Sequence, residues 1–165
     1  MKKLLLLLTF CTSVAFAQQA VKPTNQFSIG GKVKNGSVIT MDSLKQYNIQ
    51  TIGDIKVTDH TGVFKHEDDK VKGILIKDVL SHTQYAVSIS TLYFVFVAAD
   101  GYKVVYSWNE LYNTEVGNHV YILMEKNGVK AADMKESLQM TSMMDMKTGR
   151  RYLHNLDKVI VGMVE

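Results

Sequence analysis

Hydrophobic and polar residues follow one another in short segments along this chain, a pattern that is typical of short strands rather than of long helices. The most distinct segment is Leu92–Ala98, which is continuously apolar and rich in β-branched and aromatic residues. It predicts a central strand covered on both faces. The pairs Asn35-Gly36, Asp100-Gly101 and Asn127-Gly128 tolerate positive φ and predict tight turns. Further strands are expected at 27–33, 37–39, 49–57, 102–106, 119–125, 138–146 and 158–164.

Three short helices are expected between these strands. Thr40 can cap a helix that runs through Tyr47. Residues 74–82 carry apolar side chains at the spacing of a buried helical stripe, and Ser107 opens a capping box with a Glu three residues later. The polar stretch 58–72 shows neither the apolar spacing of a helix nor the apolar alternation of a strand. Because strands outnumber helices and tight turns join most of them, the sequence predicts a single α+β domain with mixed, largely antiparallel sheets.

The start of the chain has the organisation of a secretory signal. Lys2 and Lys3 precede an apolar run, and Ala15-Phe16-Ala17 supplies the small residues of a cleavage site before Gln18. The run is too short for a retained membrane span, so we expect Sec-type export to a periplasm or to the medium. The expected division of the chain is a signal peptide at 1–17, a polar lead-in at 18–26 and one domain at 27–165.

Removing this signal changes the charge balance, because the signal carries two lysines and no acid. The 19 basic residues of the whole chain become 17, against 16 acidic residues. A near-neutral exported domain lacks the positive field that sequence-independent nucleic-acid binding requires. We therefore expect a small molecule or a protein, and no nucleic acid, as the partner.

The only cysteine of the chain, Cys11, lies within the expected signal peptide. A mature protein that starts at Gln18 would contain no thiol. It could form neither a disulfide nor a thiolate metal site, and it could use no cysteine nucleophile. The sequence also contains no P-loop, no complete dinucleotide fingerprint and no nucleophile elbow.

Three segments, taken in order, carry a resemblance to a known family. Residues 73–80 read GILIKDVL and residues 97–111 read VAADGYKVVYSWNEL. Residues 145–151 read DMKTGRR, and an alternating apolar stretch follows. Together they resemble the molybdopterin-binding oxidoreductase domain, the sulfite-oxidase-type fold, over about residues 27–161. The resemblance implies that α+β fold and, for the family's enzymes, a molybdenum cofactor held by a cysteine thiolate.

The chain departs from this family where the metal would be held. The family's cysteine falls in a segment that corresponds to about residues 57–64, which here contains Thr58-Asp59-His60-Thr61-Gly62. The family's loop prolines are missing as well, since Pro23 is the only proline. Family enzymes exported with their cofactor resemble twin-arginine substrates, whereas this lysine-bearing signal predicts export of an unfolded chain. Molybdopterin is thus implied by the resemblance, but we expect no cofactor in this protein.

Candidate ligand-binding residues follow from the same segments. Arg150 and Arg151 are the only arginines, and their forked donors suit a phosphate or a carboxylate. The alternative is a polar turn in which one arginine pairs with an acid such as Asp145. The Asp-Gly-Tyr turn and the segment that replaces the family's cysteine add further polar groups. The candidate ligand-binding residues are Arg150, Arg151, Tyr102, Asp100 and His60.

A divalent metal could be held by the densest set of ligand-type side chains. His60 and His66, with the acids Glu67, Asp68 and Asp69, offer nitrogen and carboxylate ligands. The same run also has the composition of a solvated loop, and no paired spacing such as H-E-x-x-H is present. We therefore keep His60 and His66 as candidate ligands but expect no metal.

Methionines are concentrated towards the end of the chain. Thioether sulfurs suit copper(I), whereas methionine also fills irregular cores and flexible contact surfaces. On a strand at 138–146, Met140, Met144 and Met146 would share one buried face, and Met143 would lie on the other. The core strand is the favoured interpretation.

Three functional hypotheses remain open. The first is a non-catalytic binding module on the sulfite-oxidase-type scaffold, which binds a small, anionic ligand or a protein partner. The second is an active molybdopterin oxidoreductase in which Asp59 or His60 approaches the metal. The third is a hydrolase with an unrecognised site.

The signal peptide gives a direct prediction. The exported protein is expected to begin at Gln18 and to have lost its only thiol, because the cleavage site follows Ala17. Intact mass and thiol titration of protein recovered from the exported fraction measure both properties together. An exported protein that still carries Cys11 would contradict the expected cleavage.

Overall fold

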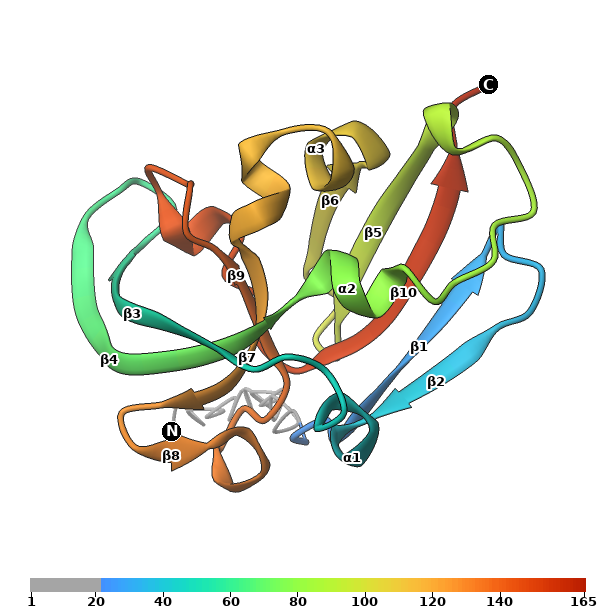
Figure 1. The fold of residues 1–165 in the computed structure, drawn as a ribbon. Helices are drawn as coiled ribbons and strands as arrows, with labels where there is room; N and C mark the ends of the chain where they lie inside the picture. Colours follow the sequence, from blue (N-terminus) through green and yellow to red (C-terminus); the bar gives the residue numbers. More distant parts are fainter. Residues whose placement is uncertain (1–21) are drawn as a thin grey trace, which may run out of the picture.

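The computed structural model describes residues 22–165, so the predicted signal peptide and the first part of the predicted lead-in lie outside the described residues. The rest of the chain forms one α+β domain built on two sheets, as expected (Figure 1). The first sheet has the order β2 (Ser37–Thr40), β1 (Gln26–Gly31), β10 (Leu156–Met163), β5 (Leu92–Ala98) and β6 (Lys103–Ser107). The second contains β3 (Gln50–Thr58), β4 (Phe64–Leu75), β7 (Val120–Lys126) and β8 (Val129–Lys130), with β9 (Gln139–Ser142) paired to β7.

Short helical segments connect these strands. The α-helices are α1 (Met41–Leu44), α2 (Ile76–Leu80) and α3 (Trp108–Tyr112). The 3-10 turns are η1 (Ile89–Thr91), η2 (Glu115–His119), η3 (Ala131–Asp133) and η4 (Thr148–Arg150). Among the strand pairs of residues 22–165 only β1 with β10 is parallel, so the sheets are mixed and largely antiparallel as predicted.

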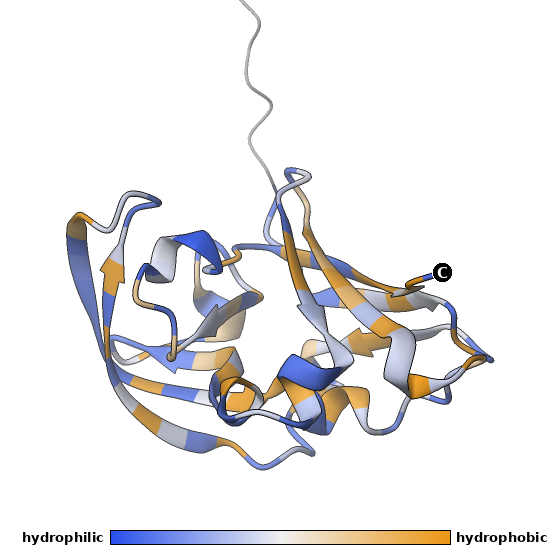
Figure 2. Cartoon of the chain, turned by 90° about the horizontal axis from the view of Figure 1, so that it is seen from above, coloured by the Kyte–Doolittle hydropathy of each residue, from blue (hydrophilic) through white to orange (hydrophobic). Residues whose placement is uncertain are grey.

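The main core lies where the two sheets and the short helices meet. Hydrophobic residues alternate with hydrophilic ones along several strands (Figure 2). One face of β7 contributes Val120, Ile122 and Met124 to the main core, and its other face contributes Tyr121 and Leu123 to a smaller cluster. Strand β7 is therefore buried on both faces and links the two clusters.

Several local predictions are confirmed. The apolar strand Leu92–Ala98 is β5, an interior strand between β10 and β6. Thr40 caps α1 and Ser107 caps α3, each through a reciprocal capping box. Gly101, Asn127 and Gly128 adopt positive φ in their predicted turns. The prediction of a tight turn at Asn35-Gly36 is wrong, because neither residue has positive φ and the five residues 32–36 join β1 to β2. The helix after Thr40 is shorter than expected, since α1 ends at Leu44.

The polar stretch 58–72 is where the prediction fails most clearly, because most of it is strand. Strand β4 runs from Phe64 to Leu75, pairs with β3 from Phe64 to Gly73, and pairs with β7 from Lys72 to its end (Figure 1). Its first part is exposed except at Asp68, which explains why no apolar alternation marks it. The pairing with β3 and β7, rather than side-chain burial, makes this segment a strand.

Two boundaries also differ from the predictions. The expected helix at 74–82 begins two residues late, because Ile74 and Leu75 pair with β7 as the end of β4. The expected strand at 138–146 ends at Ser142, which pairs with Val120 at the start of β7; beyond it the Met143 amide still donates to the His119 carbonyl at 2.9 Å, but the strand does not continue. The placement of Met144 and Met146 on a buried face is therefore wrong, and Met146 is 95% exposed.

Candidate functional site

A cavity of about 570 Å³ brings together four of the five predicted binding residues. It opens between the end of β3, the turn that joins β5 to β6, and the segment that leads from η4 towards β10. We call it the Arg150 cleft. It is lined by Val57, Thr58, Asp59, His60, Ala98, Asp100, Tyr102, Gly149, Arg150, Tyr152 and His154.

The backbone around Arg150 is fixed against the end of β3. The Thr148 hydroxyl accepts a hydrogen bond from Thr58 N at 2.8 Å and donates one to the Lys56 carbonyl at 3.1 Å. Gly149 lies so close to β3 that a Cβ there would overlap the Thr58 carbonyl oxygen. The glycine therefore allows an approach that no other residue could make, and this approach sets the position of Arg150.

The Arg150 side chain is held by one of its nitrogens only. Its Nε donates to the His60 carbonyl at 2.8 Å, and its own carbonyl accepts from the Tyr102 hydroxyl at 2.7 Å. Within residues 22–165, no carboxylate lies within ion-pair distance of the Arg150 guanidinium. The terminal nitrogens are thus available for an anion, since arginine binds carboxylate or phosphate through paired donors.

The two acids of the cleft are occupied by their own turns. One Asp59 carboxylate oxygen accepts from the Thr61 hydroxyl and from three backbone amides of residues 61–63. The Thr61 hydroxyl is the main reason that the Asp59 pKa is held well below its usual range, and the amides of Val63 and Thr61 add to the effect. The Asp100 carboxylate accepts from Tyr102 N at 2.9 Å. Both acids therefore organise loops.

Arg151, the fifth predicted residue, lies away from the cleft. Its Nε and Nη2 bind the two oxygens of Asp145 at 2.7 and 2.5 Å, and its guanidinium lies 4.4 Å from the ring centroid of Tyr106. Glu110 adds a contact at 3.4 Å. The structure therefore separates the adjacent arginines: Arg150 faces the cleft, and Arg151 forms the ion pair with Asp145 that was the alternative for this turn.

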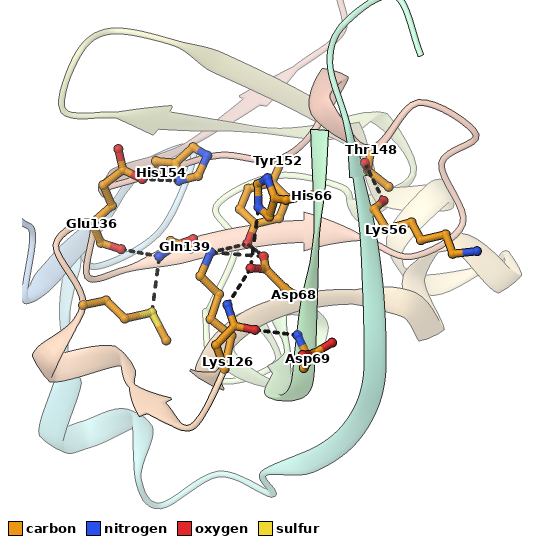
Figure 3. A network of polar contacts seen from close by, with 12 residues as sticks. Lys56, His66, Asp68, Asp69, Lys126, Glu136, Gln139, Thr148, Tyr152 and His154 are labelled. Atoms are coloured by element: carbon orange, nitrogen blue, oxygen red, sulfur yellow. Dashed lines mark hydrogen bonds and ion pairs between the residues drawn. The ribbon is translucent and has the colours of Figure 1, made fainter. Parts of the chain in front are cut away.

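A buried network lies beneath the cleft (Figure 3). Asp68, on β4, is only 1% exposed. Its carboxylate accepts hydrogen bonds from the Tyr152 hydroxyl at 2.9 Å, from Lys126 Nζ at 3.1 Å and from Asn127 Nδ2 at 3.0 Å. Tyr152 lines the cleft, so this network fixes one wall of the cavity to the second sheet.

The hydrogen bonds outweigh the cost of burying the Asp68 charge. Burial alone raises the pKa of this carboxyl, but the donors Tyr152, Lys126 and Asn127, with the charge of Lys126, lower it below its ordinary value of 3.8. Burial and the adjacent carboxylate raise the pKa of Tyr152, so its hydroxyl keeps its proton and remains a donor. The network therefore contains one fixed negative charge and one fixed positive charge.

The predicted metal ligands are not brought together as a set. His66 Nε2 lies 3.6 Å from Asp68, whose oxygens already have the partners described above. His60 belongs to the cleft, and the Asp69 amide donates to the side chain of Asn127. Within residues 22–165, no three His, Asp or Glu side chains are placed to hold one metal ion.

Sequence reasoning missed three features of the cleft. Gly149 and Thr148 position Arg150, but only the fold reveals the β3 backbone that they contact. His154 lines the cleft, stacks on Tyr152 with ring centroids 4.7 Å apart, and places Nδ1 2.8 Å from Glu136. Partial burial lowers the pKa of His154, although Glu136 opposes the effect. No motif in the sequence marks this residue.

The donor set of the cleft does not fit a thiolate-held molybdenum centre. The segment that corresponds to the family's cysteine supplies Thr58, Asp59 and His60 to the cleft. Residues 22–165 contain no cysteine, and the Asp59 carboxylate is directed into its own loop. The soft anionic ligand that such a centre requires is missing from this wall.

Comparisons with known proteins extend the fold assignment only. No protein-family model matches the chain, and no curated protein matches it. A solved structure, the sulfane dehydrogenase SoxCD from Paracoccus pantotrophus, is similar with a TM-score of 0.59 and 12% sequence identity. The match covers 82% of this chain and 37% of that chain. At this identity the similarity supports a distant fold relationship, and this chain spans little more than a third of that enzyme's length.

The buried network gives a prediction for the pH dependence of stability. The change Asp68→Asn is expected to lower the free energy of unfolding at pH 7 by about 3 kcal/mol, because it removes the partner of a buried ammonium. Since the Asp68 pKa is lowered on folding, its contribution is complete above 3.8 and is lost as the pH falls through the folded value. Urea unfolding at a series of pH values should show the difference between the two proteins shrinking below pH 3.8.

A matched control uses a surface acid. Asp157 is half exposed and lies 3.5 Å from Lys158, so Asp157→Asn is expected to cost less than ~1 kcal/mol at pH 7. An Asp68→Asn protein as stable as this control, or one with the same deficit at every pH, would contradict the account of the network.

Proposed function

We propose that this protein is an exported, non-catalytic binding module that holds a small anionic ligand in the Arg150 cleft. The observation that most supports this proposal is the set of contacts made by the Arg150 side chain. Its guanidinium is tethered at Nε, and its terminal nitrogens have no carboxylate partner among the described residues. A preorganised guanidinium without an ion-pair partner in a concave site is a binding point for a carboxylate, sulfate or phosphate group.

The size and walls of the cleft support a small ligand. Its volume of about 570 Å³ lies within the range of small-molecule sites in proteins. Val57 and Ala98 give an apolar lining, while Tyr102 and His154 offer aromatic surface beside the guanidinium. A compact anion with an apolar or planar body suits these groups better than a bare inorganic ion.

The arrangement favours binding over hydrolysis. The cleft acids are directed into their own turns, as described above, so neither is positioned as a free general base. Thr58, the only lining residue with an aliphatic hydroxyl, has Thr148 rather than a histidine as its hydroxyl neighbour. A nucleophile needs a base within hydrogen-bond reach, and the cleft does not pair one with this hydroxyl.

The proposal assigns this protein no redox reaction of the molybdopterin type. The molybdopterin enzymes that the sequence resembles use a cysteine thiolate, for which this chain has no equivalent after residue 11. The lysine-bearing signal favours export of an unfolded chain, which could not bring a cofactor inserted in the cytoplasm. Two separate features, the donor set and the export signal, thus support a scaffold that binds without transferring electrons.

Benzoate is a suitable probe because it joins a carboxylate to a planar apolar ring. It is expected to bind the protein with 1:1 stoichiometry in calorimetric titration. The change Arg150→Ala should weaken this binding by at least about tenfold, because a hydrogen bond to a charged group contributes roughly 1.5–3 kcal/mol. Backbone amide shifts of residues 58–60 and 150–154 should report the same site.

Lys158→Ala is the matched control, since it removes an exposed positive charge from the first sheet outside the cleft. It should leave the benzoate affinity unchanged. Equal benzoate affinities for the wild type and Arg150→Ala would remove Arg150 from the site, and equal losses in both variants would reduce its role to a general charge effect.

A further inference from the structure

We propose that a second groove, separate from the Arg150 cleft, binds amphipathic monoanions such as medium-chain fatty carboxylates. This groove has a volume of about 500 Å³ and lies between α1, β4, β7 and the β8–η3 turn. We call it the lysine groove. It is lined by Met41, Lys45, Ile49, Lys72, Met124, Glu125, Lys130, Ala131 and Ala132, and it shares no residue with the Arg150 cleft.

The floor of the lysine groove is apolar. Met41, Met124 and Ala131 are buried residues of the main core, so the groove reaches down to the hydrophobic interior. Ile49 stands at its edge with 43% of its surface exposed. Unbranched thioether side chains adapt to irregular partners, and burial of an alkyl chain against this floor is favourable because it removes apolar surface from water.

The rim of the groove carries an excess of positive charge. Lys72 pairs with Glu125 at 3.0 Å, and Lys45 pairs with Asp42 at 2.7 Å. Within residues 22–165, Lys130 has no carboxylate within ion-pair distance. Three ammonium groups therefore face two carboxylates, which leaves one positive charge beside an apolar floor.

This combination selects the class of ligand. A neutral apolar molecule would contact the apolar floor but would not pair with the Lys130 charge. A small hydrophilic anion would pair with this charge but would leave the floor in contact with water. A molecule with one negative head group and an alkyl tail satisfies both at once. The groove is thus complementary in charge and polarity to a fatty carboxylate.

Calorimetric titration with decanoate, below the concentration at which it forms micelles, tests the proposal. Decanoate is expected to bind in a 1:1 complex, decanol with the same tail to bind more weakly, and acetate to show no heat of binding. If decanol bound with the same affinity as decanoate, the negative charge of the ligand would have no role in binding. The absence of decanoate binding would overturn the proposal.

Variants then locate the binding site. Lys130→Glu is expected to weaken decanoate by about fivefold, the factor that corresponds to ~1 kcal/mol for an exposed charge pair. Ala132→Trp places a large side chain at an exposed lining position and should abolish binding by filling the groove. Lys103→Glu, which changes an exposed lysine of the first sheet, is the matched control and should bind normally.

The Arg150→Ala variant separates this site from the cleft. It is expected to bind decanoate as the wild type does. Loss of decanoate in Arg150→Ala with normal binding in Lys130→Glu and Ala132→Trp would place the ligand in the cleft and overturn the second site. Urea unfolding of each variant identifies any loss of binding that arises from a loss of folding.

Discussion

The buried carboxylate of Asp68 is the constraint on which the arrangement of the cleft depends. It collects donors from the second sheet, through Lys126 and the following turn, and from Tyr152 on the segment that crosses to the first sheet. A buried charge without such partners would cost several kcal/mol, so the three segments have to meet in one geometry. The crossing segment then delivers β10 between β1 and β5, in the interior of the first sheet.

The same crossing segment carries the candidate chemistry. Thr148 and Gly149 fix it to the end of β3, and Tyr152 fixes it to the buried network. Arg150 lies between these two anchors; its Nε and its carbonyl are hydrogen-bonded, and its outer nitrogens have no carboxylate partner among residues 22–165. The neighbouring Arg151 forms an ion pair with Asp145, which stabilises the scaffold. Structural and functional roles thus fall on adjacent residues of the same type.

The elements that could be predicted from the sequence are those determined by interactions between residues close together in the chain. The apolar strand β5, the capping boxes before α1 and α3, and the turns at Asp100-Gly101 and Asn127-Gly128 follow from side chains that act within a few residues. Strand β4 could not be recovered, because its polar first half is held by backbone pairing with another strand, β3, and buries only Asp68. The end of β9 also depends on a distant partner, since β7 starts at Val120.

The candidate site shows the same division. Arg150, Tyr102, Asp100 and His60 were chosen from motifs that resemble one family, and the fold places them around one cavity. Their neighbour His154 carries no signal in the sequence, and Gly149 belongs to a predicted motif, but its contact with the β3 backbone is visible only in the fold. Nor does the sequence distinguish Arg150 from Arg151, since only the direction of each side chain separates them.

We propose that this fold, which resembles the sulfite-oxidase type, serves here without a molybdenum centre. The most direct test of this proposal is elemental and pterin analysis of the protein purified from its native compartment. We predict less than stoichiometric traces of molybdenum and no bound pterin, because the cleft offers no thiolate to hold the metal. One molybdenum and one pterin per chain would contradict the claim and make the protein an oxidoreductase with an unusual metal ligand.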